Sequence, residues 1–379
     1  MPLAFSGRGC EHVSVARFYH DHLSGVASKG VALVPESSEP EPQAVVTPLT
    51  TAAIFLVVTV SPGGEDTVRD LLADMSGLQR AVGFRIPGRL SCVTSIGSHL
   101  WDRLFDGPRP GGLHPFKELN GPRHRAPATP GDLLFHIRAD RMDMCFELAS
   151  QVMTRLATVV TVADEVHGFQ YFDERDLLGF VDGTESPSGN AGLRAAIIAA
   201  DDPEFAGGSY VIVQKYLHDL DSWNAQPVEE QERAIGRTKL SDIEFPDEVK
   251  PANSHVALNT VTGPDGEERK IVRANMAFGD VGRGEYGTYF IGYAADVTVT
   301  EQMLENMFIG LPPGNTDRVL DFSTAVTGTL FFAPSADFLD NLPPAPGAIA
   351  AAAVPVPSVS ETDPTTTGSL GIGSLKGRS

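Results

Sequence analysis

Apolar residues in the middle of the chain fall into two successive groups of segments. In the first group, "AAIFLVVTV" is an apolar run of strand length, and "GEDTVRDLLADMSGLQRAV" carries apolar residues at helical spacing. The complete order is strand, helix, strand, strand, helix, strand, which is typical of a ferredoxin-like unit with helices on one face of an antiparallel sheet. The predicted strands are 52–60, 90–97, 132–140 and 158–166, and the predicted helices are 64–82 and 142–157.

The second group of segments repeats this pattern. We therefore expect an α+β fold of two ferredoxin-like halves that share a core. The N-terminal half covers residues 43–185, and the C-terminal half covers residues 186–340. In the second half, the predicted strands are 207–217, 255–262, 286–295 and 328–335, and the predicted helices are 222–236 and 300–310.

Both ends of the chain differ in composition from its middle. Residues 1–42 show no sustained helical or strand period, so we expect a flexible N-terminal extension. Residues 341–367 are rich in Pro and Ala, which predicts an extended, flexible linker. The last segment, 368–379, spaces apolar residues among glycines as a docking peptide does.

Composition and charge narrow the classes of partner. The chain has 379 residues, of which 42% are hydrophobic, so it can bury cores of ordinary size. Its 49 acidic and 29 basic residues give a net charge of -20, which disfavours nucleic acid and anionic membranes as partners. Cys10, Cys92 and Cys145 lack the spacing of a zinc site or disulfide framework. Since the N-terminus resembles no export signal, we expect a cytoplasmic protein.

The segment "LLGFVDGTES" (177–186) places one carboxylate, Asp182, at the end of an apolar run between Gly179 and Gly183. An Asp-Gly turn would explain this pattern without any function. However, Asp182 also lies at the junction of the two predicted halves, where ligand clefts commonly form. Both interpretations remain open on these residues alone.

Polar residues downstream could join Asp182 in one pocket. In "RKIVRANMAFG", Arg273 and Asn275 are two positions apart and so point to one face of an extended segment. With Asp182 they would supply a proton acceptor, a cation and a neutral donor, a set suited to cleaving an O–O bond. His255, in "NSHVALNT", is either an axial metal ligand or a core histidine satisfied by a backbone carbonyl.

Four segments together carry a family resemblance. "GFVDGTE", "SHVALN", "RANMAFG" and "PPGNTDRVLDFSTAVTG" occur in this order, and the chain resembles the dye-decolourising (DyP-type) haem peroxidases of the bacterial cytoplasmic subgroup over residues 43–338. The resemblance implies one haem b per chain, held in the C-terminal half. It also implies an enzyme that reduces hydrogen peroxide through a ferryl intermediate and oxidises dyes, phenolics or metal ions.

On the proximal side of the haem, the resemblance assigns three residues. His255 would be the iron ligand, and Asp317, in "GNTDR", would accept the N–H of its imidazole. Such a partner makes the ligand more electron-rich. Arg237, in "IGRTKL", resembles the arginine that meets a haem propionate.

On the distal side, the resemblance assigns Asp182, Arg273 and Asn275. Asp182 would move the peroxide proton, and Arg273 would stabilise developing charge. The nearby guanidinium would keep Asp182 ionised at mildly acidic pH, which predicts an acidic optimum. Gly183 would let the backbone pass close to the porphyrin.

The C-terminal "GSLGIGSLKG" resembles the targeting peptide that docks cargo inside encapsulin shells. This implies an encapsulin partner bound through residues 368–379, and location inside that compartment. A homo-oligomer is expected, with hydrogen peroxide and an organic electron donor as substrates. Two alternatives stay open: a haem protein for haem transfer or iron release without peroxidase turnover, and a non-catalytic cargo or binding module in which Asp182 and His255 are structural.

Overall fold

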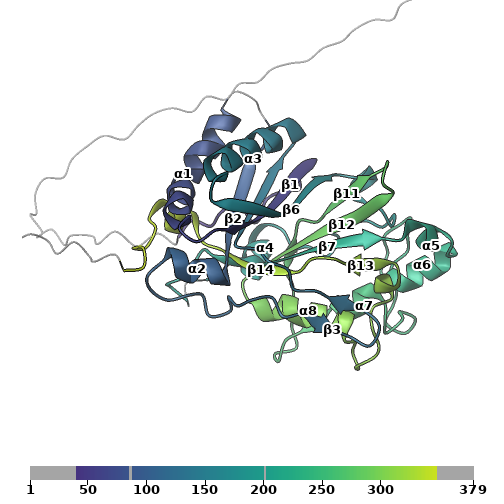
Figure 1. The fold of residues 1–379 in the computed structure, drawn as a ribbon. Helices are drawn as coiled ribbons and strands as arrows, with labels where there is room; N and C mark the ends of the chain where they lie inside the picture. The colour runs from purple at the N-terminus through teal and green to yellow at the C-terminus, as the bar shows by residue number, and fades with distance from the viewer. Residues whose placement is uncertain (1–39, 85–87, 200–201, 348–379) are drawn as a thin grey trace, which may run out of the picture. The chain divides into compact units, whose positions relative to one another are not determined.

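The computed structural model describes residues 40–84, 88–199 and 202–347 (Figure 1). Strands and helices alternate along the first part of the chain as the apolar pattern predicts. This first repeat contains β1 (Ala52–Val60), α1 (Glu65–Gly83), β2 (Ser91–Gly97), α2 (Ser98–Leu104), β3 (Leu119–Asn120), β4 (Arg125–Ala126), β5 (Leu133–Ala139), α3 (Met142–Leu156) and β6 (Val160–Phe169).

The second repeat follows a 3₁₀ turn at Phe172–Glu174, and a second such turn lies at Arg318–Asp321. Its helices are α4 (Gly189–Ala196), α5 (Leu220–Asn224), α6 (Val228–Ile235), α7 (His255–Asn259), α8 (Val297–Phe308) and α9 (Ala336–Asp340). Its strands are β7 (Ser209–His218), β8 (Val261–Thr262), β9 (Glu268–Arg269), β10 (Val272–Arg273), β11 (Met276–Asp280), β12 (Glu285–Ala294), β13 (Ser323–Ala325) and β14 (Thr329–Ala333).

The strands of each repeat pair antiparallel in the order of a ferredoxin-like unit. The first repeat has the order β6-β1-β5-β2, and the second has β11-β12-β7-β14. Pairing of β2 with β14 and of β11 with β6 joins the two sheets at both edges. The strands therefore close into an antiparallel barrel, and the expected α+β fold of two ferredoxin-like halves is confirmed.

The barrel has an inner and an outer core because side chains alternate along each strand. Phe55 of β1 packs inside the barrel with Leu134 and Tyr289, whereas its neighbours Ile54 and Leu56 pack outward. Helix α3 covers the outer face of β1 and β5, and α8 packs on β7 and β12. Figure 1 shows α1 and α3 together on the first sheet, and α7 and α8 on the second. The two halves thus share the inner core.

Two segments of the second repeat differ from the predicted elements. The single helix expected over 222–236 is two helices, α5 and α6, because Pro227 lacks a backbone N–H and stands at the N-cap of α6. The strand expected over 255–262 is wrong: its first part is α7. The Ser254 side chain accepts a hydrogen bond from Ala257 N and so caps this helix.

The predicted terminal segments lie largely outside the described residues. This holds for residues 1–39 of the extension, for the linker beyond 347 and for the whole of 368–379. At the described ends, Glu41 N donates to Asp337 Oδ2 at 2.8 Å, and Asp106 N donates to the Pro344 carbonyl at 2.8 Å. Within the described part of the chain, no helix is both long enough and apolar enough to span a membrane.

Candidate active site

A cavity lies on the outer face of the second sheet, between β7, β12 and the helices α7 and α8. Thr288 and Phe290 of β12 line it, and they alternate with Tyr289, which points into the barrel. The loop 176–185 forms another wall. The cavity and its open mouth together enclose about 1410 Å³. Its walls are largely apolar, with Leu178, Phe180, Val256, Ile271, Met303, Leu304 and Met307 among the lining residues.

His255 enters the cavity from the first turn of α7. Its Nδ1 lies 2.7 Å from Oδ2 of Asp317, whose side chain is fully buried. The other carboxylate oxygen of Asp317 accepts a hydrogen bond from Val319 N at 2.9 Å. Asn259 donates from its amide to the His255 carbonyl at 2.8 Å. Because Asp317 holds the Nδ1 side of the ring, Nε2 is left to bind a metal in the cavity.

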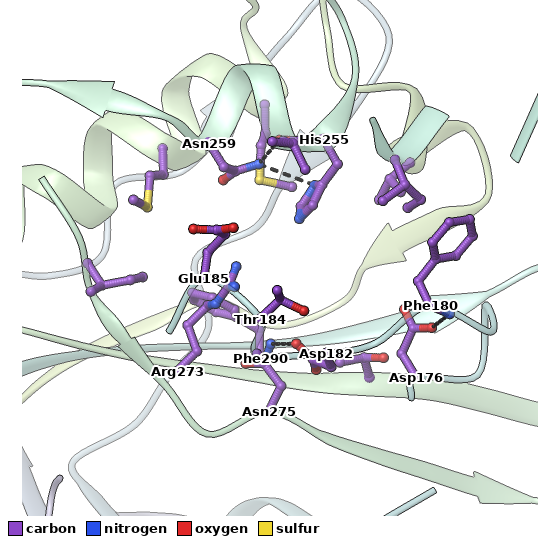
Figure 2. A pocket seen from close by; sticks show the side chains of 18 of the residues that line it. Asp176, Phe180, Asp182, Thr184, Glu185, His255, Asn259, Arg273, Asn275 and Phe290 are labelled. Atoms are coloured by element: carbon purple, nitrogen blue, oxygen red, sulfur yellow. Dashed lines mark hydrogen bonds between the residues drawn. The ribbon is translucent and has the colours of Figure 1, made fainter. Parts of the chain in front are cut away.

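Asp182 lies on the opposite side of the cavity from His255 (Figure 2). Asn275 donates from Nδ2 to Asp182 Oδ1 at 3.2 Å, and the orientation of that amide is fixed because Asn275 Oδ1 accepts from Ile291 N at 3.1 Å. The backbone of Asp182 is also held, since its N donates to the Glu174 carbonyl at 2.9 Å. Both the side chain and the backbone of Asp182 are therefore held by hydrogen bonds.

Arg273 lines the same side of the cavity as Asp182 (Figure 2). Its backbone N donates to Ser186 Oγ at 3.0 Å, which ties the end of β10 to the loop that carries Asp182. The Arg273 guanidinium forms no ion pair with a residue in the described ranges, in contrast to Arg237. It can therefore offer its hydrogen bonds and charge to a ligand.

Arg237 and Gly183 also line the cavity. The Arg237 guanidinium donates to Asp242 Oδ1 at 2.9 Å, to Glu185 Oε1 at 3.0 Å and to Glu244 Oε2 at 3.3 Å. The predicted contact between Arg237 and a haem propionate would therefore form next to the three carboxylates that already pair with this arginine. Gly183 has a φ of +86°, and an added Cβ would meet no atom within 4 Å, so its backbone faces open space.

His218 and Asp176 are among the cavity residues that the sequence analysis did not single out. His218 has Nδ1 2.8 Å from Ser323 Oγ and Nε2 3.0 Å from Thr288 Oγ1, and burial lowers its pKa to about 4, which keeps it neutral. Asp176 lies in the loop that carries Asp182, and burial raises its pKa to about 7. The only available signal for Asp176 was its position, six residues before Asp182.

The structure thus brings most of the predicted site residues to one cavity. Asp317 is the exception, since it lies behind His255 and does not line the cavity. The residues that line it are Asp182, Gly183, Arg237, His255, Arg273 and Asn275.

Family models match nearly all of the described chain. The model described as "Dyp-type peroxidase, N-terminal" matches residues 42–170, and "Dyp-type peroxidase, C-terminal" matches residues 173–338. A dye-decolorizing peroxidase of Mycobacterium tuberculosis is 64% identical over 337 residues, which is 89% of this chain and 97% of the relative.

Solved structures show the same similarity. An encapsulated DyP-type peroxidase from Mycobacterium smegmatis matches with a TM-score of 0.80 and 64% identity, over 81% of this chain and 100% of that chain. A variant of DypB from Rhodococcus jostii RHA1 in complex with haem matches with a TM-score of 0.78 and 57% identity, over 80% of this chain and 99% of that chain.

Proposed function

The chain belongs to the Dyp-type peroxidase family, and on that premise we propose that it binds one haem b between His255 and Asp182 and uses hydrogen peroxide to oxidise organic donors. Family membership makes the chain a peroxidase with a haem cofactor. The proposal adds which residues bind the haem and which act on bound peroxide. It also adds the electron donors, which are dyes, phenolics and metal ions. One observation carries it: a histidine held by a buried carboxylate faces an acid, an amide and an arginine across one cavity.

The residues present fit a haem. His255 offers Nε2 to the cavity, and the apolar walls suit a porphyrin face. Gly183 leaves room for close approach on the distal side. Arg237 lies at the cavity wall where a propionate could join its carboxylate partners. His255 would therefore hold the iron, and Asp317 would keep the imidazole in the tautomer that binds metal.

On the distal side, Asp182 would transfer protons and Arg273 would stabilise negative charge. When bound, haem supplies an iron that binds peroxide and the electrons that split its O–O bond. Asp182, oriented by Asn275, accepts the proton that the peroxide must lose on binding. Arg273 stabilises the negative charge that then develops on the peroxide oxygens, because its guanidinium is already in place.

The proposal is tested by titrating haem into the full-length protein and then assaying steady-state oxidation of a dye with hydrogen peroxide. We expect a high-spin ferric spectrum, because His255 would be the protein ligand to the iron and the opposite side of the cavity would be left for peroxide, and we expect turnover that depends on peroxide. Tight haem binding without turnover would instead favour haem transfer or iron release. No haem binding would favour a non-catalytic cargo or binding module.

Asp317→Asn should weaken haem binding or the peroxide reaction by about 10–100-fold, the usual cost of losing a carboxylate that orients a metal-bound histidine. Asparagine can still accept from Val319 N, so the local turn should persist. The measurement is a haem titration followed at the Soret band, together with the rate after peroxide mixing. Asp321→Asn is the control, because Asp321 pairs with Arg123 and does not line the cavity. An Asp317→Asn variant that matches the parent in both measurements would contradict the assigned role.

We propose further that residues 368–379 dock this peroxidase inside an encapsulin shell in the cytoplasm. The segment itself lies outside the described residues, and support comes from its sequence and from the encapsulated relative. Leu370, Ile372 and Leu375 are three apolar anchors, and burying each in a shell pocket could contribute about 1.5–3 kcal/mol. Several tails on one homo-oligomer would add avidity.

Deleting residues 368–379 should abolish co-purification with a co-expressed encapsulin shell protein while leaving haem content and peroxidase rate unchanged. The apolar anchors would be lost, but no described residue of the cavity would be altered. Shell capture is measured by size-exclusion chromatography and gel analysis. Continued packaging of the shortened chain would show that the docking site lies elsewhere, and lost activity would place the tail in the catalytic unit.

A further inference from the structure

Two aspartates, Asp176 and Asp182, lie on the loop that forms the distal wall of the cavity, whereas the proposed function uses only Asp182. Figure 2 shows Asp176 and Asp182 on the same side, opposite His255. Both residues also line a smaller adjoining cavity, which encloses about 460 Å³ including its opening and reaches Arg273 and Asn275. We propose that Asp176 is the acid partner of Asp182, so that one carboxyl group donates a proton during peroxide cleavage while the other accepts one. This inference rests on the proposed peroxidase function.

Asp176 is fixed in place by the turn that it begins. Its Oδ1 accepts a hydrogen bond from Phe180 N at 2.9 Å. Its backbone N donates to the Phe180 carbonyl at 2.8 Å, and its own carbonyl accepts from Gly179 N at 3.1 Å. These contacts leave Oδ2 without a hydrogen-bond partner among the described residues, while the side chain lines both cavities. The carboxyl group is thus rigidly held and has one oxygen available for a proton.

The surroundings of Asp176 favour the protonated form of its carboxyl group. Burial is the main cause that raises the pKa of Asp176 to about 7, and the negative charge of Asp182 adds to it. Hydrogen bonds from the N–H groups of Phe180 and Gly179 lower the pKa of Asp176 but do not outweigh burial.

Two cations, Lys239 and Arg175, lie near Asp176, but neither forms an ion pair with its carboxyl group. Lys239 interacts with the charge of Asp176, but its Nζ donates to Gln231 Oε1 at 2.6 Å. Arg175 directs Nη1 to the carbonyls of Gly179 and Lys239 rather than to the carboxyl group. Asp182, by contrast, accepts from the Asn275 amide and shares its cavity wall with Arg273. Such divergent environments are how proteins assign an acid and a base within one carboxyl pair.

With these two roles, Asp176 and Asp182 together supply and accept all the protons that peroxide cleavage requires. Hydrogen peroxide loses one proton to Asp182 as it binds, and the O–O bond breaks with electrons supplied by the haem. The departing oxygen keeps its own proton and receives a second from Asp176, so it leaves as water. Asp182 now holds the proton that Asp176 gave up. Transfer from Asp182 back to Asp176, directly or through cavity water, restores the starting state with no net proton gained or lost.

Asp176→Asn tests this assignment because the amide can still accept from Phe180 N but has no carboxylic proton to give. In stopped-flow mixing of the haem-loaded protein with peroxide, the variant should react about 10²-fold more slowly at pH 5–6. The deficit should shrink as the pH rises through about 7, where Asp176 of the parent loses its proton. Asp173→Asn is the matched control, since Asp173 is exposed in the same segment and lines neither cavity.

A second readout is independent of turnover. The infrared spectrum of the resting, haem-loaded parent at pH 6 should show a protonated carboxyl band that is absent from Asp176→Asn and retained in Asp173→Asn. Asp176→Glu should restore part of the rate at pH 6. A parent-like rate and pH profile in Asp176→Asn, or an unchanged carboxyl band, would overturn the proposal. If the parent itself does not react with peroxide, the proposed function fails instead.

Discussion

Replacing His255 by alanine should deprive the protein of stably bound haem. His255 is the residue of the cavity whose ring is oriented by a buried carboxylate, and its Nε2 would be the protein ligand to iron. Losing an orienting partner of a metal ligand costs about 10–100-fold in affinity, so losing the ligand itself should cost more than about 10²-fold. The measurement is a haem titration of the full-length variant followed at the Soret band.

His167→Ala is the control for that titration. His167 is exposed on β6 and pairs with Glu165 at 2.7 Å, away from the cavity. It should bind haem as the parent does. A His255→Ala variant that retains an unchanged Soret band and unchanged affinity would remove His255 from the role of iron ligand.

Arg273→Leu should slow the reaction of the haem-loaded protein with peroxide by about 10²-fold or more. A preorganised charge that stabilises a developing anion is worth that much in a site shielded from water. The Arg273 side chain lines the distal wall and forms no ion pair with any described residue, so its charge is available to the peroxide. Rapid mixing with peroxide, followed by absorbance, gives the rate directly.

Two variants complete the test of the distal wall. Arg283→Leu is the control, because its side chain is 79% exposed and lies outside the cavity. Asp182→Ala should also react slowly, since positioned acid–base groups contribute about 10²–10⁴-fold. If Arg273→Leu and Asp182→Ala both react at the parent rate, the distal assignment is wrong.

The regular part of the fold was predictable because its elements have strong periods. The run 52–60 and the amphipathic segment 64–82 became β1 and α1 with only small shifts of their ends. By contrast, 255–262 was predicted as a strand, yet a side-chain cap from Ser254 makes its first part helical. In so short a segment, local capping outweighs the apolar pattern.

The site was predictable only in part, because its residues meet through tertiary contacts. The spacing of Arg273 and Asn275 placed both on one wall, and their partner Asp182 was visible at the junction of the repeats. The pairing of His255 with Asp317 spans 62 positions and came from the family resemblance, since no local pattern encodes it. The raised pKa of Asp176 depends on burial, which one sequence does not reveal.

The central claim is that the cavity between His255 and the Asp182–Arg273 wall binds haem and cleaves peroxide. Its most direct test is stopped-flow mixing of the haem-loaded parent and the Asp182→Ala/Arg273→Leu double variant with hydrogen peroxide, without donor. We predict that both proteins bind haem alike, that the parent spectrum changes rapidly, and that the double variant reacts at least about 10²-fold more slowly. A double variant that reacts as fast as the parent would contradict the account.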